Sequence, residues 1–478
     1  MHRLFARAVV VGLCFAAESG YSQEAATAVQ EVIVPAVSLA EYYAPTAMPD
    51  RIILSLVGDP STARGINWRT SPDISTAYAE FAEAQAGPLF VNSTQRVTAT
   101  TEAVQVDSVT AHFHHANLID LKANTPYVYR VGDGTNWSEW FQFRTTPSEN
   151  TPFSFVYFGD AQNQIRSLWS RVIREAYRDA PQAAFILHAG DLINQAESDS
   201  EWAEWFAAGA WLNAMTPTVA LPGNHEYTKN PDDTRRLSHL WRPSFHQPTN
   251  GPAGLEETCF TMVYHNMRLI ALNSNTQLAE QAAWLEQVLA ANQEPWVVCS
   301  FHHPVYSTGK SRDNPELRNL WKPIFDKYKV DLVLTGHDHT YGRTGFEVPG
   351  LLTVEVGGQD VAVADQPEVN LPTGVQALDS AGTVYVVSVS GPKMYDHSRM
   401  EFMKRIAEDT QLYQVISIDG NKLRFEAKTA IGELYDAFEL HKTSPGEKNR
   451  LVEVPVTIPQ NLRPTPPPAV AAEPEVKN

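Results

Sequence analysis

The sequence predicts a protein of the α+β or α/β class, in which a β-sandwich precedes a sheet covered by helices. Two patterns support this prediction. Residues 50–148 contain short alternating apolar runs separated by turn signals, which is typical of a sandwich. From residue 152 onward, short apolar runs alternate with helical patterns, which indicates a sheet with helices on its surface. The 478 residues also exceed what one hydrophobic core usually serves, so two domains are expected.

The first 22 residues predict a secretory signal peptide. Arg3 and Arg7 form a basic start, residues 8–17 are mostly apolar, and small and polar residues follow. That apolar run is too short to span a bilayer, and no other segment offers the roughly 20 apolar residues a spanning helix needs. We therefore expect a secreted or periplasmic protein without a membrane span. Export would permit a disulfide between Cys259 and Cys299, although the sequence alone cannot pair them.

The predicted sandwich domain occupies residues 45–148. Its first strands are expected at 51–57 and 63–68, on either side of the turn Gly58–Asp59–Pro60. Two late strands are expected at 125–130 and 140–143. The histidines of His112–His115 lack a nearby carboxylate or thiolate at metal-site spacing, so we expect exposed or partly buried strand residues there.

The second predicted domain occupies residues 152–442. Apolar runs predict strands at 153–158, 183–187, 216–221, 269–273, 296–301 and 330–334. Helical periodicity predicts helices between them, at 167–177, 201–211, 278–291 and 317–328. The β-rich stretches 384–389 and 413–440 are expected to complete the sheets. Residues 443–478 are rich in Pro, Glu and Val, which predicts a disordered tail.

Five of the predicted strands end in residues that can bind metal ions: Asp160, Asp191, Asn224 with His225, His302 with His303, and His337 with His339. We expect these side chains to meet at one edge of a sheet, where strand ends carry function. Carboxylates and imidazoles without thiolates suit Zn, Mn or Fe. The set exceeds what one catalytic metal needs and fits two metals that share a carboxylate. Glycines precede several of these residues, which permits tight turns and a close backbone approach.

In this order the strand-end motifs resemble those of the calcineurin-like metallophosphoesterase superfamily, and more narrowly those of purple acid phosphatases and their bacterial relatives. The matching motifs are Gly159–Asp160, Gly190–Asp191, Gly223–Asn224–His225–Glu226, His302–His303–Pro304 and Gly336–His337–Asp338–His339. Residues 66–70 and 121–130 resemble the fibronectin-type-III-like domain that precedes the catalytic domain in that family. The resemblance covers roughly residues 45–442. It implies the metallophosphoesterase fold, a β-sheet sandwich flanked by helices.

The resemblance also implies a ligand set. One metal would be held by Asp160, Asp191 and His339, and a second by Asp191, Asn224, His302 and His337. The cofactors would be two divalent or mixed-valence ions, of Fe, Zn or Mn. His225 would be the catalytic residue beside the leaving group.

This site implies an acid phosphatase, which hydrolyses phosphate monoesters of small molecules by attack of a metal-bound hydroxide. A protonated His225 would stabilise the departing alkoxide. Ligand histidines must stay neutral while His225 must stay charged, so a bell-shaped pH profile is expected.

Two positions depart from the family pattern. The Tyr ligand that colours the purple enzymes would stand at Asn194, so we expect a colourless protein. The His that contacts substrate beyond the His-x-Pro motif is absent here, and Lys310 or Arg312 could replace it.

Four further residues have open roles. Gln162 and Asn194 could bind a metal or contact its ligands, and His303 and Tyr341 could contact substrate.

Two other functions stay open. A phosphodiesterase or nucleotide-cleaving enzyme would use the same metal pair, with specificity set by loops. A binding protein with an inactive catalytic fold is the third possibility, although the candidate ligand set is complete. The net charge of −18 argues against nucleic acid as a bound partner, because phosphate neutralisation needs clustered Lys and Arg. The sequence leaves the natural substrate and the oligomeric state open.

Overall fold

The computed structural model describes residues 37–464, apart from 107, 233, 350–352, 357–358, 363–377, 380–381 and 444–446. The predicted signal peptide lies outside these residues. The chain divides into two compact units. The first unit, residues 1–42, is described only near its end, where the helix α1 (Leu39–Tyr42) forms. Everything that follows belongs to the second unit. In the described part of the chain, no helix has the length and apolar character needed to cross a bilayer.

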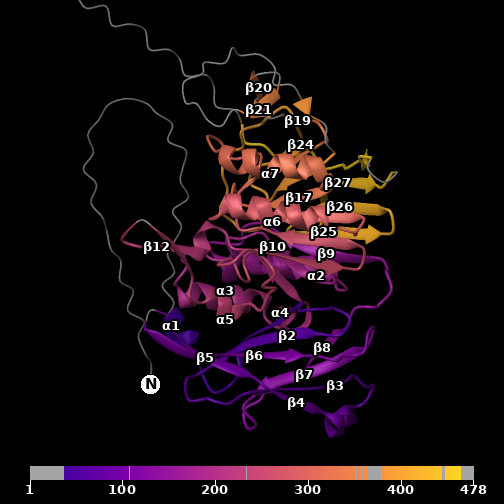
Figure 1. Ribbon diagram of the computed structural model, residues 1–478. Coiled ribbons are helices and arrows are strands. Elements are labelled where there is room, and N and C mark those ends of the chain that lie inside the picture. The colour runs from indigo at the N-terminus through magenta and orange to yellow at the C-terminus, as the bar shows by residue number, and fades with distance from the viewer. Residues whose placement is uncertain are drawn as a thin grey trace, which may run out of the picture. The chain divides into compact units, whose positions relative to one another are not determined.

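The predicted β-sandwich is confirmed (Figure 1). One sheet has the order β1 (Asp50–Ser55), β2 (Arg64–Thr70), β6 (Val109–Leu118), β5 (Thr100–Val106). The other has the order β4 (Gln95–Thr98), β3 (Tyr78–Glu83), β7 (Pro126–Gly132), β8 (Phe141–Arg144), with a 3₁₀ turn at Pro88–Ser93. Trp68 and Tyr129 lie fully buried in the core between the sheets. In β8 apolar and polar residues alternate, which turns Phe141 and Phe143 toward this core, whereas every residue of β2 is buried.

The second domain contains two seven-stranded sheets that face each other. The first has the order β11 (Thr218–Ala220), β10 (Ile186–His188), β9 (Phe153–Phe158), β25 (Leu412–Asp419), β26 (Lys422–Thr429), β27 (Leu434–His441), β28 (Arg450–Glu453). The second has the order β14 (Phe260–Tyr264), β15 (Met267–Ala271), β16 (Trp296–Ser300), β17 (Leu332–Thr335), β23 (Val384–Val387), β18 (Tyr341–Thr344), β24 (Met403–Ala407). Strands β9–β11 are parallel, and so are β15–β17.

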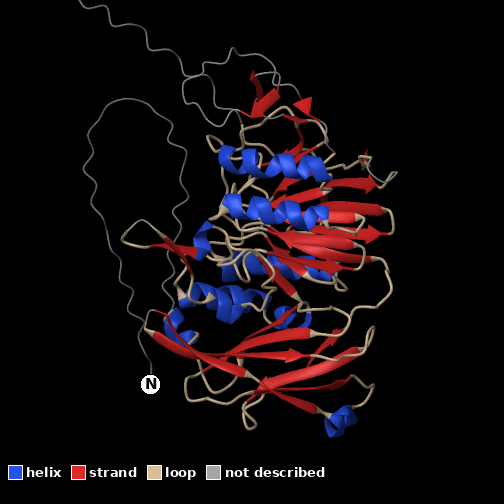
Figure 2. Cartoon of the chain, in the orientation of Figure 1, coloured by secondary structure: helices blue, strands red, loops and turns tan. Residues whose placement is uncertain are grey.

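Helices cover the outer faces of both sheets (Figure 2). The first sheet carries α2 (Ser170–Asp179), α3 (Asp199–Gly209), α4 (Trp211–Met215) and the short α5 (Trp241–Ser244). The second carries α6 (Leu278–Ala290) and α7 (Pro315–Tyr328). Indole and phenyl rings dominate these contacts: Trp202 and Trp205 of α3 are buried against the first sheet, and Trp321 and Phe325 of α7 against the second. The architecture is the predicted sandwich of sheets flanked by helices.

Two sequence-based expectations are wrong in detail. The metal-binding strand ends were expected at one sheet edge, but β9, β10 and β11 belong to one sheet and β16 and β17 to the other. The tail was expected to be disordered from residue 443, but β28 pairs with β27, with Leu440 opposite Leu451. A Pro-rich composition does not reveal an unpaired sheet edge that a short apolar run can complete. Residues 465–478 of the predicted tail lie outside the described residues.

The interface between the sandwich and the second domain contains a charged cluster, here called the junction cluster, in which Arg51, Arg69 and Asp199 are buried and the Asp50 side chain is partly exposed. Arg51 Nη2 lies 2.8 Å from Asp199 Oδ2, and Arg69 Nη1 lies 3.2 Å from the same oxygen. Arg69 Nη2 also lies 2.6 Å from Asp50 Oδ2. Since the two arginine side chains are only 3% and 1% exposed, the carboxylates are their main source of compensating charge.

Cys259 and Cys299 are both buried free thiols, so the structure does not join them in a disulfide.

Candidate metal centre

The metal-binding residues predicted from the sequence come together between the ends of five strands. Asp160 follows β9, Asp191 follows β10, and a 3₁₀ turn at Asn224–Glu226 follows β11. His302 follows β16, and His337 and His339 lie in the turn between β17 and β18. Asp160, Asp191, His302 and His339 are at most 2% exposed. The two facing sheets therefore supply the site jointly, three strands from one and two from the other.

The backbone at the site adopts conformations that side-chain-bearing residues rarely adopt. Asp191, His337 and His339 have φ angles of 52°, 75° and 49°. Such left-handed residues cost about 1–3 kcal/mol each and persist only where the surroundings impose them. The turn at His337–His339 also directs the two imidazoles to different groups, whereas a His-x-His on a strand would present both on one face.

Two glycines leave room for the carboxylates. A Cβ atom on Gly223 would lie 2.1 Å from Asp191 Oδ1, and one on Gly336 would lie 2.2 Å from Asp160 Oδ1. No side chain fits at such distances, so the glycines predicted to permit a close approach are required here for that reason.

The first group of candidate ligands contains Asp160, Asp191 and His339, whose ligand atoms lie within 4.8 Å of one another. His339 Nε2 is 3.0 Å from Asp160 Oδ2. The other imidazole nitrogen, Nδ1, lies 2.9 Å from the backbone oxygen of Lys393 and donates to it. Gln162 Nε2 donates to Asp191 Oδ2 at 2.9 Å, so Gln162 contacts the ligands from beside the site.

The second group contains His302, His337 and Asn224. His302 Nε2 lies 3.2 Å from Asp191 Oδ2, 3.2 Å from Asn224 Oδ1 and 3.1 Å from His337 Nδ1. His302 Nδ1 donates to the backbone oxygen of Ala189 at 2.9 Å. Asp191 therefore stands between the two groups, as a shared carboxylate would.

The donor chemistry fits metal ions. With Nδ1 donating to a carbonyl, neutral His302 and neutral His339 each direct the lone pair of Nε2 at a carboxylate oxygen. Lone pairs of two acceptors repel at 3.0–3.2 Å unless a proton or a cation lies between them. Asp160 Oδ2 also accepts no hydrogen bond from the described residues, although it is buried. Histidine oriented by a backbone carbonyl is the usual arrangement of a metal ligand.

Electrostatics in the metal-free site follow from the same geometry. Burial lowers the pKa of His302, but the carboxylates of Asp191 and Asp160 outweigh burial and raise this pKa to about 10. Burial disfavours the ionised form of Asp160, yet His339 and His302 hold its pKa below the usual range. Burial, together with the charge of His302, holds the pKa of His337 far below its usual value. Without metal, the site therefore keeps a proton on His302, which a bound cation would displace.

His225 lies at the mouth of the site. Its backbone N–H donates to Asp191 Oδ1 at 2.9 Å, and its Nδ1 donates to the backbone oxygen of Asn194 at 2.7 Å. The side chain is 27% exposed, and Nε2 lies 4.0 Å from Asp191 Oδ2. Asn194 thus contributes its backbone, which orients His225.

The predicted substrate contacts divide into those near the site and those away from it. The His303 ring centroid lies 4.2 Å from that of His337, and His303 Nδ1 is 2.8 Å from Ser274 Oγ. Arg312 Nη1 donates to the backbone oxygen of His337 at 3.1 Å. Lys310 is exposed on the neighbouring loop.

Tyr341 does not lie in the site. It is fully buried, and its hydroxyl donates to Asp436 Oδ2 at 2.7 Å on the far sheet. Its position two residues after His339 suggested proximity, but β18 begins at Tyr341 and turns its side chain into the core. The predicted substrate contact at Tyr341 is therefore wrong.

Sequence reasoning missed two carboxylates that shape the site. Glu226 is fully buried and accepts hydrogen bonds from the backbone N–H groups of Asp191, Leu192 and Gly223 at 2.9, 2.8 and 2.6 Å. Burial and the charge of Asp191 raise the pKa of Glu226 to about 8. Asp338 accepts from the N–H of Thr308 at 2.6 Å. Both residues lie inside motifs that the sequence analysis names. The feature that could have revealed them is a carboxylate directly beside a predicted site residue.

Comparison with known proteins identifies the class of this fold. Residues 153–341 match the family described as calcineurin-like phosphoesterase, so the second domain is a metallophosphoesterase domain. Residues 49–145 match the purple acid phosphatase N-terminal domain. The chain thus carries a purple acid phosphatase N-terminal domain followed by a calcineurin-like phosphoesterase domain.

Individual relatives agree with this assignment. The chain is 27% identical over 311 residues to probable purple acid phosphatase 20 of Arabidopsis thaliana, a match covering 62% of this chain and 69% of the relative. It is 29% identical over 272 residues to acid phosphatase type 7 of Danio rerio, covering 48% and 57%. The structure of purple acid phosphatase PPD1 from yellow lupin seeds shares the fold, with a TM-score of 0.65 and 18% identity over 82% of this chain and 74% of that one.

Proposed function

We propose that this protein is an exported phosphatase with two metal ions that hydrolyses phosphate monoesters of small molecules. One observation carries the proposal. Two groups of candidate ligands converge on Asp191, and no arginine or lysine side chain is recorded within ion-pair distance of Asp160 or Asp191 in the described residues. The name acid phosphatase type 7 borne by one relative supports a monoester as the substrate.

The residues of the chain divide the work. Asp160, Asp191 and His339 would hold one cation, and Asp191, Asn224, His302 and His337 the other. Such a pair binds phosphate oxygens and supplies a hydroxide nucleophile at moderate pH. His225, with Nδ1 fixed by Asn194, presents Nε2 at the mouth, where a leaving alkoxide would receive a proton. His303 and Arg312, which contact Ser274 and the backbone of His337, would contact the phosphate.

The proposal is tested with metal-stripped protein resupplied with Mn, Zn or Fe. Hydrolysis of p-nitrophenyl phosphate and of bis(p-nitrophenyl) phosphate is measured across pH. A metal-dependent preference for the monoester supports the proposal and names the working metal. Preference for the diester favours a phosphodiesterase, and no turnover with any metal favours a binding protein.

Two further parts of the proposal have their own tests. Asn194 has no phenolate, so the metal-loaded protein is expected to lack a strong visible charge-transfer band. A visible spectrum with an intense purple band would contradict this. Export is supported by residues 1–22 alone, and fractionation of cells expressing the full chain tests it.

A further inference from the structure

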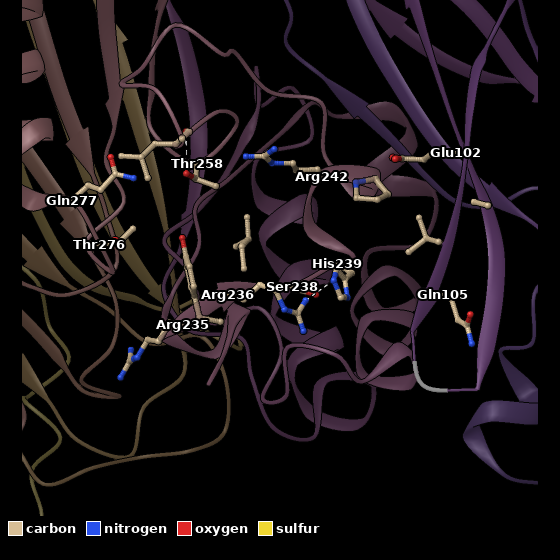
Figure 3. Close-up of a pocket in the computed structure, with 17 residues that line it drawn as sticks. Glu102, Gln105, Arg235, Arg236, Ser238, His239, Arg242, Thr258, Thr276 and Gln277 are labelled. Carbon is tan, nitrogen blue, oxygen red and sulfur yellow. Dashed lines mark hydrogen bonds between the residues drawn. The ribbon is translucent and has the colours of Figure 1, made fainter. Parts of the chain in front are cut away.

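A cavity of about 630 Å³ lies between the sandwich and the second domain (Figure 3). One wall is β5 of the sandwich, with Glu102 and Gln105. The opposite wall is the hairpin of β12 (Tyr227–Lys229) and β13 (Arg235–Leu237). Thr276 and Gln277 line a third side. The volume falls within the range of small-molecule sites and exceeds what a phosphate group alone needs.

The cavity walls continue the loops of the metal centre. Tyr227 is two residues from His225, and its hydroxyl accepts from Asn273 Nδ2 at 2.7 Å. Asn275 Nδ2, one residue before the wall residue Thr276, donates to the backbone oxygen of Pro222 at 2.9 Å. Ser274 Oγ lies 2.8 Å from His303 Nδ1. The segment 273–275, which leads to the wall residue Thr276, is therefore hydrogen-bonded to the loops that carry His225 and His303.

Three arginines line the cavity, and they differ in their partners. Arg236 Nη1 lies 2.9 Å from Glu197 Oε1, and Arg242 Nη2 lies 3.2 Å from Glu256 Oε2. Among the described residues no carboxylate is recorded within ion-pair distance of Arg235, and its side chain is exposed. Figure 3 shows its guanidinium directed away from Arg236 and Arg242. Arg235 lies opposite Lys229 in the hairpin whose first strand begins two residues after His225.

We propose that this cavity receives the leaving group of the substrate and that Arg235 binds a second anionic group on it. This inference rests on the proposed phosphatase function and names its substrate class: phosphate monoesters that carry a second phosphate or a carboxylate. The whole chain has a net charge of −18, which repels such substrates, so a cation with no recorded carboxylate partner among the described residues would attract the second anionic group to the cavity. The apolar wall residues Val104, Leu237 and Leu255 would contact the carbon skeleton of the leaving group.

Two matched substrate pairs test the proposal on the metal-loaded full chain. Adenosine 3′,5′-bisphosphate is compared with adenosine 5′-monophosphate, and 3-phosphoglycerate with glycerol 3-phosphate. Each pair differs by one anionic group, phosphate in the first and carboxylate in the second. In the variant Arg235→Gln, kcat/KM for the doubly anionic member of at least one pair should fall about tenfold or more, the value of one charge-assisted hydrogen bond. Its singly anionic partner should change less than about threefold.

Two further variants separate charge from shape. Arg178→Gln removes a cation whose side chain is 78% exposed on α2. It should leave the ratio of the kcat/KM values within each substrate pair unchanged. Ala103→Trp places a larger side chain on the β5 wall and so narrows the cavity. It should raise KM for the adenosine substrates but not for p-nitrophenyl phosphate.

The outcomes distinguish this inference from the proposed function. If Arg235→Gln lowers kcat/KM selectively for the doubly anionic member of either pair, the inference is supported. The pair that responds then identifies the second group as phosphate or carboxylate. If wild-type protein hydrolyses p-nitrophenyl phosphate but Arg235→Gln lowers both members of each pair equally, or neither, the inference is wrong while the proposed function stands. If wild-type protein hydrolyses none of these esters with any metal, the proposed function fails, and the inference fails with it.

Discussion

The metal centre and the junction cluster both contain buried carboxylates, those of Asp160 and Asp191 and that of Asp199, but the charges are compensated in different ways. In the junction cluster, Arg51 and Arg69 supply fixed positive charge to Asp50 and Asp199. In the metal centre, the carboxylates of Asp160 and Asp191 accept hydrogen bonds from backbone N–H groups and the Gln162 amide, and the side chains recorded within ion-pair distance of them in the described residues are imidazoles.

This difference separates a structural cluster from a functional one. Arginine keeps its charge at every physiological pH, so the junction cluster is complete in the folded chain. Imidazole becomes neutral when its proton leaves, so the carboxylates of the metal centre then need a cation from solution. A buried charged group that the chain does not compensate permanently is the better candidate for a ligand site.

The largest expected effect is at the carboxylate that both groups of the metal centre share. Asp191→Asn should lower kcat for p-nitrophenyl phosphate at least about 10³-fold, because neither metal position keeps its full charge. Metal content per protein, measured by elemental analysis, should fall in parallel. Asp179→Asn, on the surface, is the matched control. Activity within tenfold of wild type would show that Asp191 is not the shared ligand.

The junction cluster should respond in stability instead of activity. Asp199→Asn leaves Arg51 without its carboxylate, which should cost about 3–5 kcal/mol of unfolding free energy. Thermal and denaturant unfolding measure this loss, and kcat/KM of the folded enzyme should stay within about twofold. A large loss of activity at unchanged stability would show that the junction cluster contributes to catalysis and is not a purely structural cluster.

Metal removal should expose the proton that the metal centre holds. With a pKa of about 10 when folded and an ordinary value near 6.5, charged His302 stabilises the metal-free protein fully below pH 6.5. That contribution is lost as pH rises toward 10. Binding of Zn or Mn at pH 7 should therefore release protons, and a metal concentration of 100 Kd should add about 2.7 kcal/mol to stability. Calorimetry in two buffers of different ionisation enthalpy measures the release, and equal heats would contradict it.

The smallest expected effect concerns histidines at the domain interface. The His115 and His246 rings lie 3.7 Å apart between centroids, and Glu257 is 3.6 Å from His246. Burial and His115 lower the pKa of His246 to about 4, so stability should fall as pH drops from 6.5 toward 4. Partial exposure limits the effect to roughly 1–2 kcal/mol. His246→Phe should flatten this decline in pH-dependent unfolding, and an unchanged slope would show that the pair does not titrate there. Burial raises the pKa of nearby Glu257 to about 7, which acts in the opposite sense, so Glu257→Gln is the companion variant.

Much of the fold and the site could be predicted because both depend on local patterns. Strand β9 is an apolar run followed directly by Gly159 and Asp160, and this pattern needs no knowledge of the rest of the chain. The candidate ligands were found for the same reason, since a polar residue at the end of a buried strand lies at the sheet edge wherever the strand pairs. Their assignment to two metal positions stays a prediction that the metal titrations test.

Long-range pairing was beyond the sequence. The run that forms β9 does not show that it pairs with β25, about 260 residues later, or that β16 belongs to another sheet. The same limit explains β28, which completes an edge, and Tyr341, whose side chain follows the new strand into the core.

The sequence by itself thus determined the residue types, their order and the strand ends that carry them, because hydrophobic period and turn chemistry are local. Only the tertiary structure decided which atoms face one another. It sets Nε2 of His339 against Asp160 and pairs Arg51 with Asp199. It also places Arg235 beside a cavity whose other wall comes from the sandwich. These contacts join residues more than a hundred positions apart. They are fixed by the packing of two sheets and two domains, which no local pattern encodes.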